Sequence, residues 1–136
     1  MPNVVIRMAH TNEGPLIGRW VADWGGPSWE WLDWSQCAPY WLVGEVDSVV
    51  RGVAMVHPGI PFGRMEMMCV DPSLDHKHKA LLCRDFAYAG LESCKALGSQ
   101  AMIVCIDHDD QDWKRIITRR GGIEMGSGTY MLKRCL

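Results

Sequence analysis

Two short polar clusters have side chains of the types that bind metals or phosphates. The first comprises, in order, Asp75, His76, Lys77, His78 and Lys79. The second runs from Asp107 to Asp110. Histidine and carboxylate are zinc ligands, but neither cluster has a second ligand group at the spacing of a zinc site. We therefore predict no metal site and interpret both clusters as polar strand ends and helix caps.

The cysteines offer a second kind of chemistry. They are Cys37, Cys69, Cys83, Cys94, Cys105 and Cys135. None forms a C-x-x-C pair, and most lie in apolar segments, which is typical of free, buried thiols in a reducing compartment. No cysteine has a histidine at a recognisable nucleophile spacing. We expect a cytoplasmic protein, of a cell or of an infected host, without thiol catalysis.

Tryptophan is concentrated in one part of the chain, since six of the seven lie between Trp20 and Trp41. Trp20 and Trp24 have helical spacing and are expected in the core. Trp29 and Trp31 are two residues apart, so they cannot both face one core from a helix. We expect the segment from Trp29 to Trp41 to form a homodimer or protein interface, or to wall the site of an amine acceptor.

The composition limits the class of protein. The chain has 136 residues, of which 48% are hydrophobic and 22% charged, and its net charge is -2. These values suit a globular protein and give no sign of a nucleic-acid partner. No apolar run reaches the ~18 residues of a membrane span, so we expect no membrane partner. We expect residues 1–136 to form a single domain.

The strands are predicted from runs of β-branched and apolar residues. They are residues 4–8, 41–46, 49–57, 64–70, 100–106 and 129–134. Asp47 and Ser48 form the turn between the second and third strands, and Asp71-Pro72 ends the fourth. The fifth is almost wholly apolar, as expected for a central strand covered on both faces.

Capping residues and apolar spacing predict the helices between these strands. One begins at Asn12 and ends at Gly25-Gly26-Pro27, and a second short helix or an ordered loop follows around residues 29–34. A long helix covers residues 77–97, with Gly98 as its terminal glycine. The last is capped by Asp109 or Asp110 and ends at Gly121-Gly122. The order β-α-α-β-β-β-α-β-α-β predicts a mixed α/β fold, a central mixed sheet with helices on both faces.

This order resembles the GCN5-related N-acetyltransferase (GNAT) superfamily over nearly the whole chain. Each matching segment is short, and their order and spacing carry the resemblance. The segments are residues 45–54 (second and third strands), 66–72 (fourth strand and its Val-x-Pro end), 80–82 (start of the cofactor helix), 103–107 (fifth strand) and 120–123 (end of the next helix).

The resemblance implies an acyl-CoA N-acyltransferase fold that takes acetyl-CoA as co-substrate. In this family the fourth and fifth strands splay apart, and the pantetheine arm pairs with the fourth. Met68, Cys69 and Val70 would face that arm. The pyrophosphate would lie against amides at the N-terminus of the next helix, where the dipole favours an anion. Here that loop comprises Asp75, His76, Lys77, His78, Lys79 and Ala80.

The phosphate loop departs from the family pattern of Gln or Arg, two residues, Gly, one residue, and Gly or Ala. Only Ala80 agrees. His78 stands where Gly normally lets the backbone approach the phosphate, and Asp75 brings a negative charge to an anion site. Lys77, Lys79 and protonated histidines could compensate by binding phosphate directly.

The resemblance also suggests catalytic residues. Glu66, four residues before Val70, matches a Glu that relays a proton from the acceptor amine in some members. The alternative is a strand carboxylate paired with Arg64 or Arg51. Where the family usually has its general-acid Tyr, the chain has Thr118.

Two functions remain open. The first is an acyl-CoA-dependent N-acetyltransferase that transfers an acetyl group to an amine, with Glu66 as the base. The alternative is a catalytically inactive GNAT-fold protein with a structural or interaction role, of the kind also found among virus-encoded and virion proteins. Fold alone does not choose between them, because function depends on the site.

Overall fold

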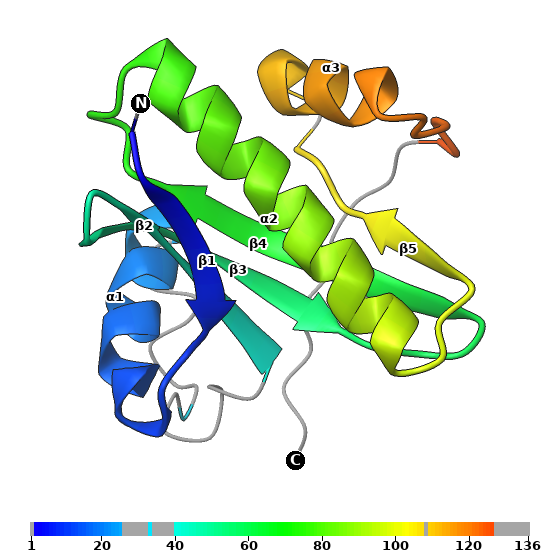
Figure 1. The fold of residues 1–136 in the computed structure, drawn as a ribbon, viewed down its shortest axis with the longest axis horizontal. Helices are drawn as coiled ribbons and strands as arrows, with labels where there is room; N and C mark the ends of the chain where they lie inside the picture. Colours follow the sequence, from blue (N-terminus) through cyan, green and yellow to red (C-terminus); the bar gives the residue numbers. More distant parts are fainter. Residues whose placement is uncertain (1, 26–32, 34–39, 108, 127–136) are drawn as a thin grey trace.

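The computed structural model describes residues 2–25, 33, 40–107 and 109–126, and its arrangement is drawn in Figure 1. The described chain forms one mixed sheet with helices around it. The elements are β1 (Val4–Met8), the 3-10 turn η1 (Thr11–Glu13), α1 (Gly14–Gly25), β2 (Trp41–Val46), β3 (Val49–His57), β4 (Phe62–Val70), α2 (His76–Ala96), β5 (Ala101–Val104) and α3 (Gln111–Arg119).

The sheet has the strand order β1-β2-β3-β4-β5. Its neighbours are antiparallel except for β4 and β5, which run parallel. The mixed sheet predicted from the sequence is therefore confirmed. So is the turn between β2 and β3, where Asp47 and Ser48 both have positive φ angles, 50° and 66°, as a two-residue type I′ hairpin requires.

The long helix α2 crosses one face of the sheet, and α3 lies beside it (Figure 1). The core on this face contains Leu82 and Phe86 from α2, Trp113 from α3 and Met65 from β4, all buried. Gly44 lets α2 approach closely, since a Cβ there would lie 2.6 Å from Leu82 Cδ1. The apolar strand side chains and the helix thus form a dry layer.

Helix α1 packs on the opposite face, so helices cover both faces, as predicted. Ile17 and Val21 are fully buried there against Val43, Val53 and Cys69. The sequence places apolar residues every three or four positions along α1, which produces this single buried stripe.

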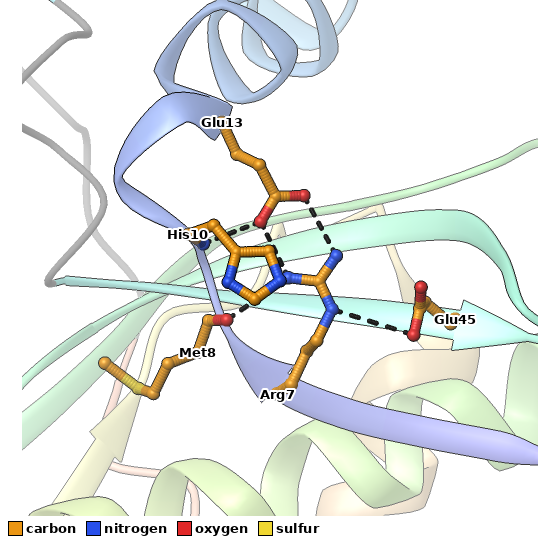
Figure 2. A network of polar contacts seen from close by, with 5 residues as sticks. All are labelled: Arg7, Met8, His10, Glu13 and Glu45. Atoms are coloured by element: carbon orange, nitrogen blue, oxygen red, sulfur yellow. Dashed lines mark hydrogen bonds and ion pairs between the residues drawn. The ribbon is translucent and has the colours of Figure 1, made fainter.

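A polar clamp fastens the start of α1 to the sheet (Figure 2). The guanidinium of Arg7, on β1, donates to both carboxylate oxygens of Glu13, at 2.7 and 2.9 Å. Arg7 Nε lies 3.6 Å from Glu45 on β2, and the His10 amide donates to Glu13 at 2.6 Å. Hydrogen bonds donated by Arg7 are the largest cause that lowers the Glu13 pKa, to about 2.

The clamp explains one wrong prediction, because Asn12 does not cap α1. Asn12 lies inside the 3-10 turn that precedes Gly14. Glu13 instead accepts from the His10 amide at the start of that turn. Arg7, on the preceding strand β1, holds the Glu13 carboxylate there and overrides the local preference of Asn12 for a cap position.

Two strand boundaries also differ from prediction. β4 begins at Phe62, two residues before Arg64, because Phe62 and Gly63 pair with β5. β5 spans only Ala101–Val104 instead of residues 100–106, and its residues are exposed or partly buried. The prediction that it is covered on both faces is therefore wrong for the part of the sheet that the structure describes.

The helix ends agree with the predicted glycines. Gly98 has a φ of 94°, and the Ser99 amide donates to Cys94 O at 3.0 Å. Gly121 has a φ of 89°, and the Gly122 amide donates to Ile117 O at 3.0 Å. Both are Schellman ends, which need a left-handed residue after the helix.

Some predictions fall outside the described residues, namely the short helix at 29–34 and the strand at 129–134. Most of the segment from Trp29 to Trp41 also lies outside them, but Trp41 begins β2 and is buried. Within the described ranges, no helix is long and apolar enough to cross a membrane.

Candidate functional site

The candidate site lies where β4 and β5 separate. Their pairing runs from Phe62 with Ala101 to Met65 with Val104. The last bond joins the Cys105 amide to Met65 O at 2.9 Å. β4 continues to Val70, paired on its other side with β3. Over the described residues, the second half of β4 thus has no β5 partner, which is the splay that the family resemblance implies.

A β-bulge interrupts the same half of β4. Met55 of β3 pairs with Glu66 and Val53 pairs with Cys69, so two residues of β4 oppose one residue of β3. Met67 takes the extra position with a φ of 52°. A bulge leaves the ladder locally incomplete and redirects neighbouring backbone groups, which is a common feature beside active sites.

The three β4 residues predicted to face a ligand have their side chains in the core. Met68 and Val70 pack against the α2 core, and Cys69 is buried in the α1 core. Burial raises the Cys69 pKa to about 12. The thiol therefore stays protonated at neutral pH, and only the backbone of these residues is suited to contact a ligand along β4.

The N-terminus of α2 lies beyond the end of β4, with Asp75 as its N-cap. The carboxylate accepts from the His78 amide at 2.8 Å, and its other oxygen lies 2.6 Å from His78 Nδ1. Hydrogen bonds from the His78 amide and ring lower the Asp75 pKa. Asp75 is therefore ionised at neutral pH and occupies the amides of its own helix.

Charges of both signs surround this helix end. A cleft of about 100 Å³ between α2 and α3 is lined by His76, Lys79, Arg115 and Arg119, together with Asp110 and Asp112. Lys79 also lines a second, open cleft with four aspartates, Asp107, Asp109, Asp110 and Asp112. The predicted helix cap is Asp110, which accepts from the Trp113 amide at 3.0 Å. The basic residues therefore face nearby carboxylates.

Those carboxylates form no metal cluster. Among the residues that the structure describes, no group of three His, Cys, Asp or Glu side chains has metal-binding geometry. Asp110 has a structural use, since its cap satisfies an amide at the start of α3.

Glu66 lies in the first position after the paired half of β4. Its side chain is 14% exposed, and Arg64 NH1 lies 3.6 Å from Oε1. The Cys105 thiol donates to the same oxygen at 3.7 Å. Of the two arginines considered as partners, Arg64 is close, whereas Arg51 pairs with Asp71 at 2.7 Å. The carboxylate is thus a partly buried group beside the opening between β4 and β5.

Solved structures share the fold of this chain. An aminoglycoside N-acetyltransferase AAC(6')-Iy, solved with a bisubstrate analogue of CoA, superposes with a TM-score of 0.74 at 15% identity, covering 98% of this chain and 99% of its own. The chain has the fold of the GCN5-related N-acetyltransferases. No protein-family model and no curated protein matches the sequence itself.

Other GNAT-fold structures are similar at lower scores. A ribosomal-protein-alanine N-acetyltransferase from Brucella melitensis has a TM-score of 0.64 at 11% identity, covering 99% of this chain and 100% of its own. A diaminobutyrate acetyltransferase from Paenibacillus lautus, solved with its substrate and coenzyme A, has a TM-score of 0.65 at 12% identity, covering 88% and 75%. At such identities the likeness establishes the GNAT fold alone.

Two features of the site were not predicted from the sequence. Cys105 has no local motif, and its contact with Glu66 depends on where β5 ends. The bulge at Met67 uses a residue type that rarely adopts positive φ, so no glycine marks it. Thr118, at the position of the family's Tyr, donates its hydroxyl to Lys114 O at 2.8 Å, within its own helix.

Proposed function

We propose that the chain is an acyl-CoA-dependent N-acetyltransferase that uses acetyl-CoA to acetylate an amine. The observation that carries the proposal is the separation of β4 from β5 after Met65, combined with the bulge at Met67. An extended amide-containing arm can pair with a strand whose edge is open, because strand addition needs only free backbone groups. The solved GNAT-fold neighbours with CoA bound support the same ligand.

In the proposed reaction, the residues of the chain orient the two substrates. The backbone of residues 68–70 holds the pantetheine arm, and amides near Cys69 polarise the thioester carbonyl. Glu66 accepts the proton of the attacking amine, directly or through a water. The Cys69 thiol has a pKa of about 12, so the amine attacks the thioester without a covalent intermediate on this residue. The amide C–N bond forms as the C–S bond breaks, and CoA leaves as a thiolate that takes up a proton from water.

The binding step can be tested by thermal unfolding with millimolar acetyl-CoA, CoA or ATP. A ligand at ~100 times its dissociation constant stabilises the folded state by roughly 2.7 kcal/mol, a shift of several degrees. We expect a shift with both CoA forms and none with ATP. A second assay would follow release of the CoA thiol with aminoglycoside, diamine and peptide amines as acceptors. Equal shifts with ATP and acetyl-CoA would contradict a specific donor site.

A second function is favoured by one specific observation, the Asp75 carboxylate at the α2 N-terminus. It puts a negative charge where the pyrophosphate of the donor would lie. In a catalytically inactive protein with an interaction role, no pyrophosphate binds there, so this charge would not weaken ligand binding. That alternative predicts no shift with any CoA compound and no thiol release.

A further inference from the structure

The α2 N-terminus already holds an anion, and it belongs to the protein. The Asp75 carboxylate accepts from the His78 amide at 2.8 Å, and the amide of Lys77 also contributes to its lowered pKa. Its second oxygen lies 2.6 Å from His78 Nδ1. An ionised carboxylate only accepts hydrogen bonds, so Nδ1 carries the proton in this contact. The carboxylate therefore has the same partners that an incoming phosphate would need.

Most of the basic side chains near this helix end lie close to carboxylates other than Asp75. In the first turn of α2 the cations are Lys77 and Lys79, with His76 beside them. Lys79 faces the aspartates that precede and begin α3, and His76 Nδ1 lies 3.9 Å from Asp112. Arg115 is itself 3.3 Å from Asp112. His76, Lys79 and Arg115 are therefore already paired with or placed against carboxylates other than Asp75.

We propose that Asp75 is a specificity-determining residue for the acyl donor, because it competes with the donor's phosphates for the α2 amides. The inference rests on the proposed function, since it concerns the same donor site. Its consequence is that the protein holds its donor mainly through the acylated pantetheine arm along β4. The nucleotide end of acetyl-CoA then adds little affinity, and donors that lack the pyrophosphate bind almost as well.

The test measures the binding of each of two donors to each of three proteins. Dissociation constants for acetyl-CoA and for S-acetylpantetheine, which lacks all phosphates, are measured by calorimetry with the wild type, Asp75→Asn and Asp75→Gly. Asn keeps a capping oxygen for the His78 amide but removes the charge. Gly removes the charge and also frees the amide, at little cost to a cap position.

We expect both variants to bind acetyl-CoA more tightly while their affinity for S-acetylpantetheine stays constant. Two unit charges ~4 Å apart in a water-like medium interact enough to change a binding constant ~5-fold. We therefore expect a gain of at least ~5-fold for Asp75→Asn, and a larger gain for Asp75→Gly. The difference in acetyl-CoA affinity between the two variants measures competition for the His78 amide, separately from the effect of charge.

The matched control is Asp85→Asn, which removes the same charge from the same helix. Asp85 pairs with Arg84 at 2.8 Å, and it lies ten residues along α2 from Asp75. At ~1.5 Å per residue this is ~15 Å, beyond the ~8 Å screening length at physiological salt. We expect this variant to bind both donors like the wild type, and all variants to keep the wild-type unfolding midpoint.

The outcomes separate the two proposals. If both donors bind but no Asp75 variant changes the acetyl-CoA affinity, the role of Asp75 is refuted and the proposed function stands. An equal gain in Asp85→Asn would also refute it, since net charge alone would then explain the effect. If no protein binds either donor, the proposed function fails, and this inference fails with it.

Discussion

The two faces of the sheet use the same strands for different purposes. The face under α2 is apolar, and its buried residues include Leu42, Ala54 and Val56. By strand alternation, the face under α1 has the charged side chains of β1, β2 and β4: Arg7, Glu45, Arg64 and Glu66. The Cys105 thiol points to this second face as well, where it donates to Glu66.

Because of this difference, the α2 face contributes mainly to stability, and the charged groups on the α1 face are available for chemistry. On the α2 face, glycines allow contacts that a larger side chain would prevent, as at Gly63, where a Cβ would lie 2.3 Å from Cys94 Sγ. On the α1 face, charges are paired beside an opening in the sheet. We therefore expect substitutions on the first face to change folding and those around Glu66 to change activity.

The largest effect should come from the α2 face, in Phe86→Ala. Phe86 is fully buried and lies under Gly44 and Gly52. Removing its ring creates a cavity, which costs ~3–5 kcal/mol of unfolding free energy. Leu91→Ala on the exposed side of the same helix should cost less than ~1 kcal/mol. Urea unfolding of both variants would measure this, and similar losses would contradict a dry layer under α2.

Next in size is the effect of Glu66→Gln on catalysis. Loss of a general base typically lowers the rate 10²–10⁴-fold, and we expect at least ~100-fold in kcat at constant acetyl-CoA affinity. Stability should change little, since the ion-pair partner at 3.6 Å, Arg64, has a largely exposed side chain. Arg64→Gln is the control, because it removes the ion pair and keeps the carboxylate.

A wild-type rate in Glu66→Gln would mean that the carboxylate is not the general base and serves only as a paired strand residue. A loss of similar size in Arg64→Gln would mean that the ion pair matters rather than the base. Either outcome would weaken the conclusion that the α2 face serves stability and the charged groups of the α1 face serve activity.

Local signals were enough to predict most of the fold. The turn at Asp47 and Ser48, the left-handed glycines Gly98 and Gly121, and the cap at Asp110 depend on residues that are close in sequence. Each is set by a steric or hydrogen-bonding preference of one or two residue types. The alternation of apolar and polar residues along the strands then fixes which face is buried.

The predictions that failed depend on contacts between elements rather than on the preferences of single residues. Asn12 does not cap α1 because Arg7, on β1, holds the carboxylate of Glu13. β5 is shorter than its apolar sequence because its partner strand turns away after Met65. The bulge at Met67 depends on the register between β3 and β4, which no local pattern in β4 specifies. The site is built from these non-local features, so it was less predictable than the fold.

The smallest effect should come from the clamp on the α1 face, and it should depend on pH. Glu13 has a pKa of about 2, below its ordinary value of 4.5, mainly through hydrogen bonds from Arg7. A lowered carboxyl pKa stabilises the folded state above the unfolded pKa, and this contribution is lost as pH falls towards 2. Screening by solvent reduces it, and we expect Glu13→Gln to lose ~1–2 kcal/mol at pH 6.

Urea unfolding of the wild type and Glu13→Gln at pH 6, 4 and 2.5 would measure this difference, which should be full at pH 6 and shrink through pH 4. Glu45→Gln is the control, since its carboxylate lies 3.6 Å from Arg7 Nε and should contribute less at every pH. A Glu13→Gln deficit that stays constant down to pH 2.5 would mean that the side chain acts through packing. The α1 face would then be held by apolar contacts alone, like the α2 face, and its charged groups would be free to serve the site.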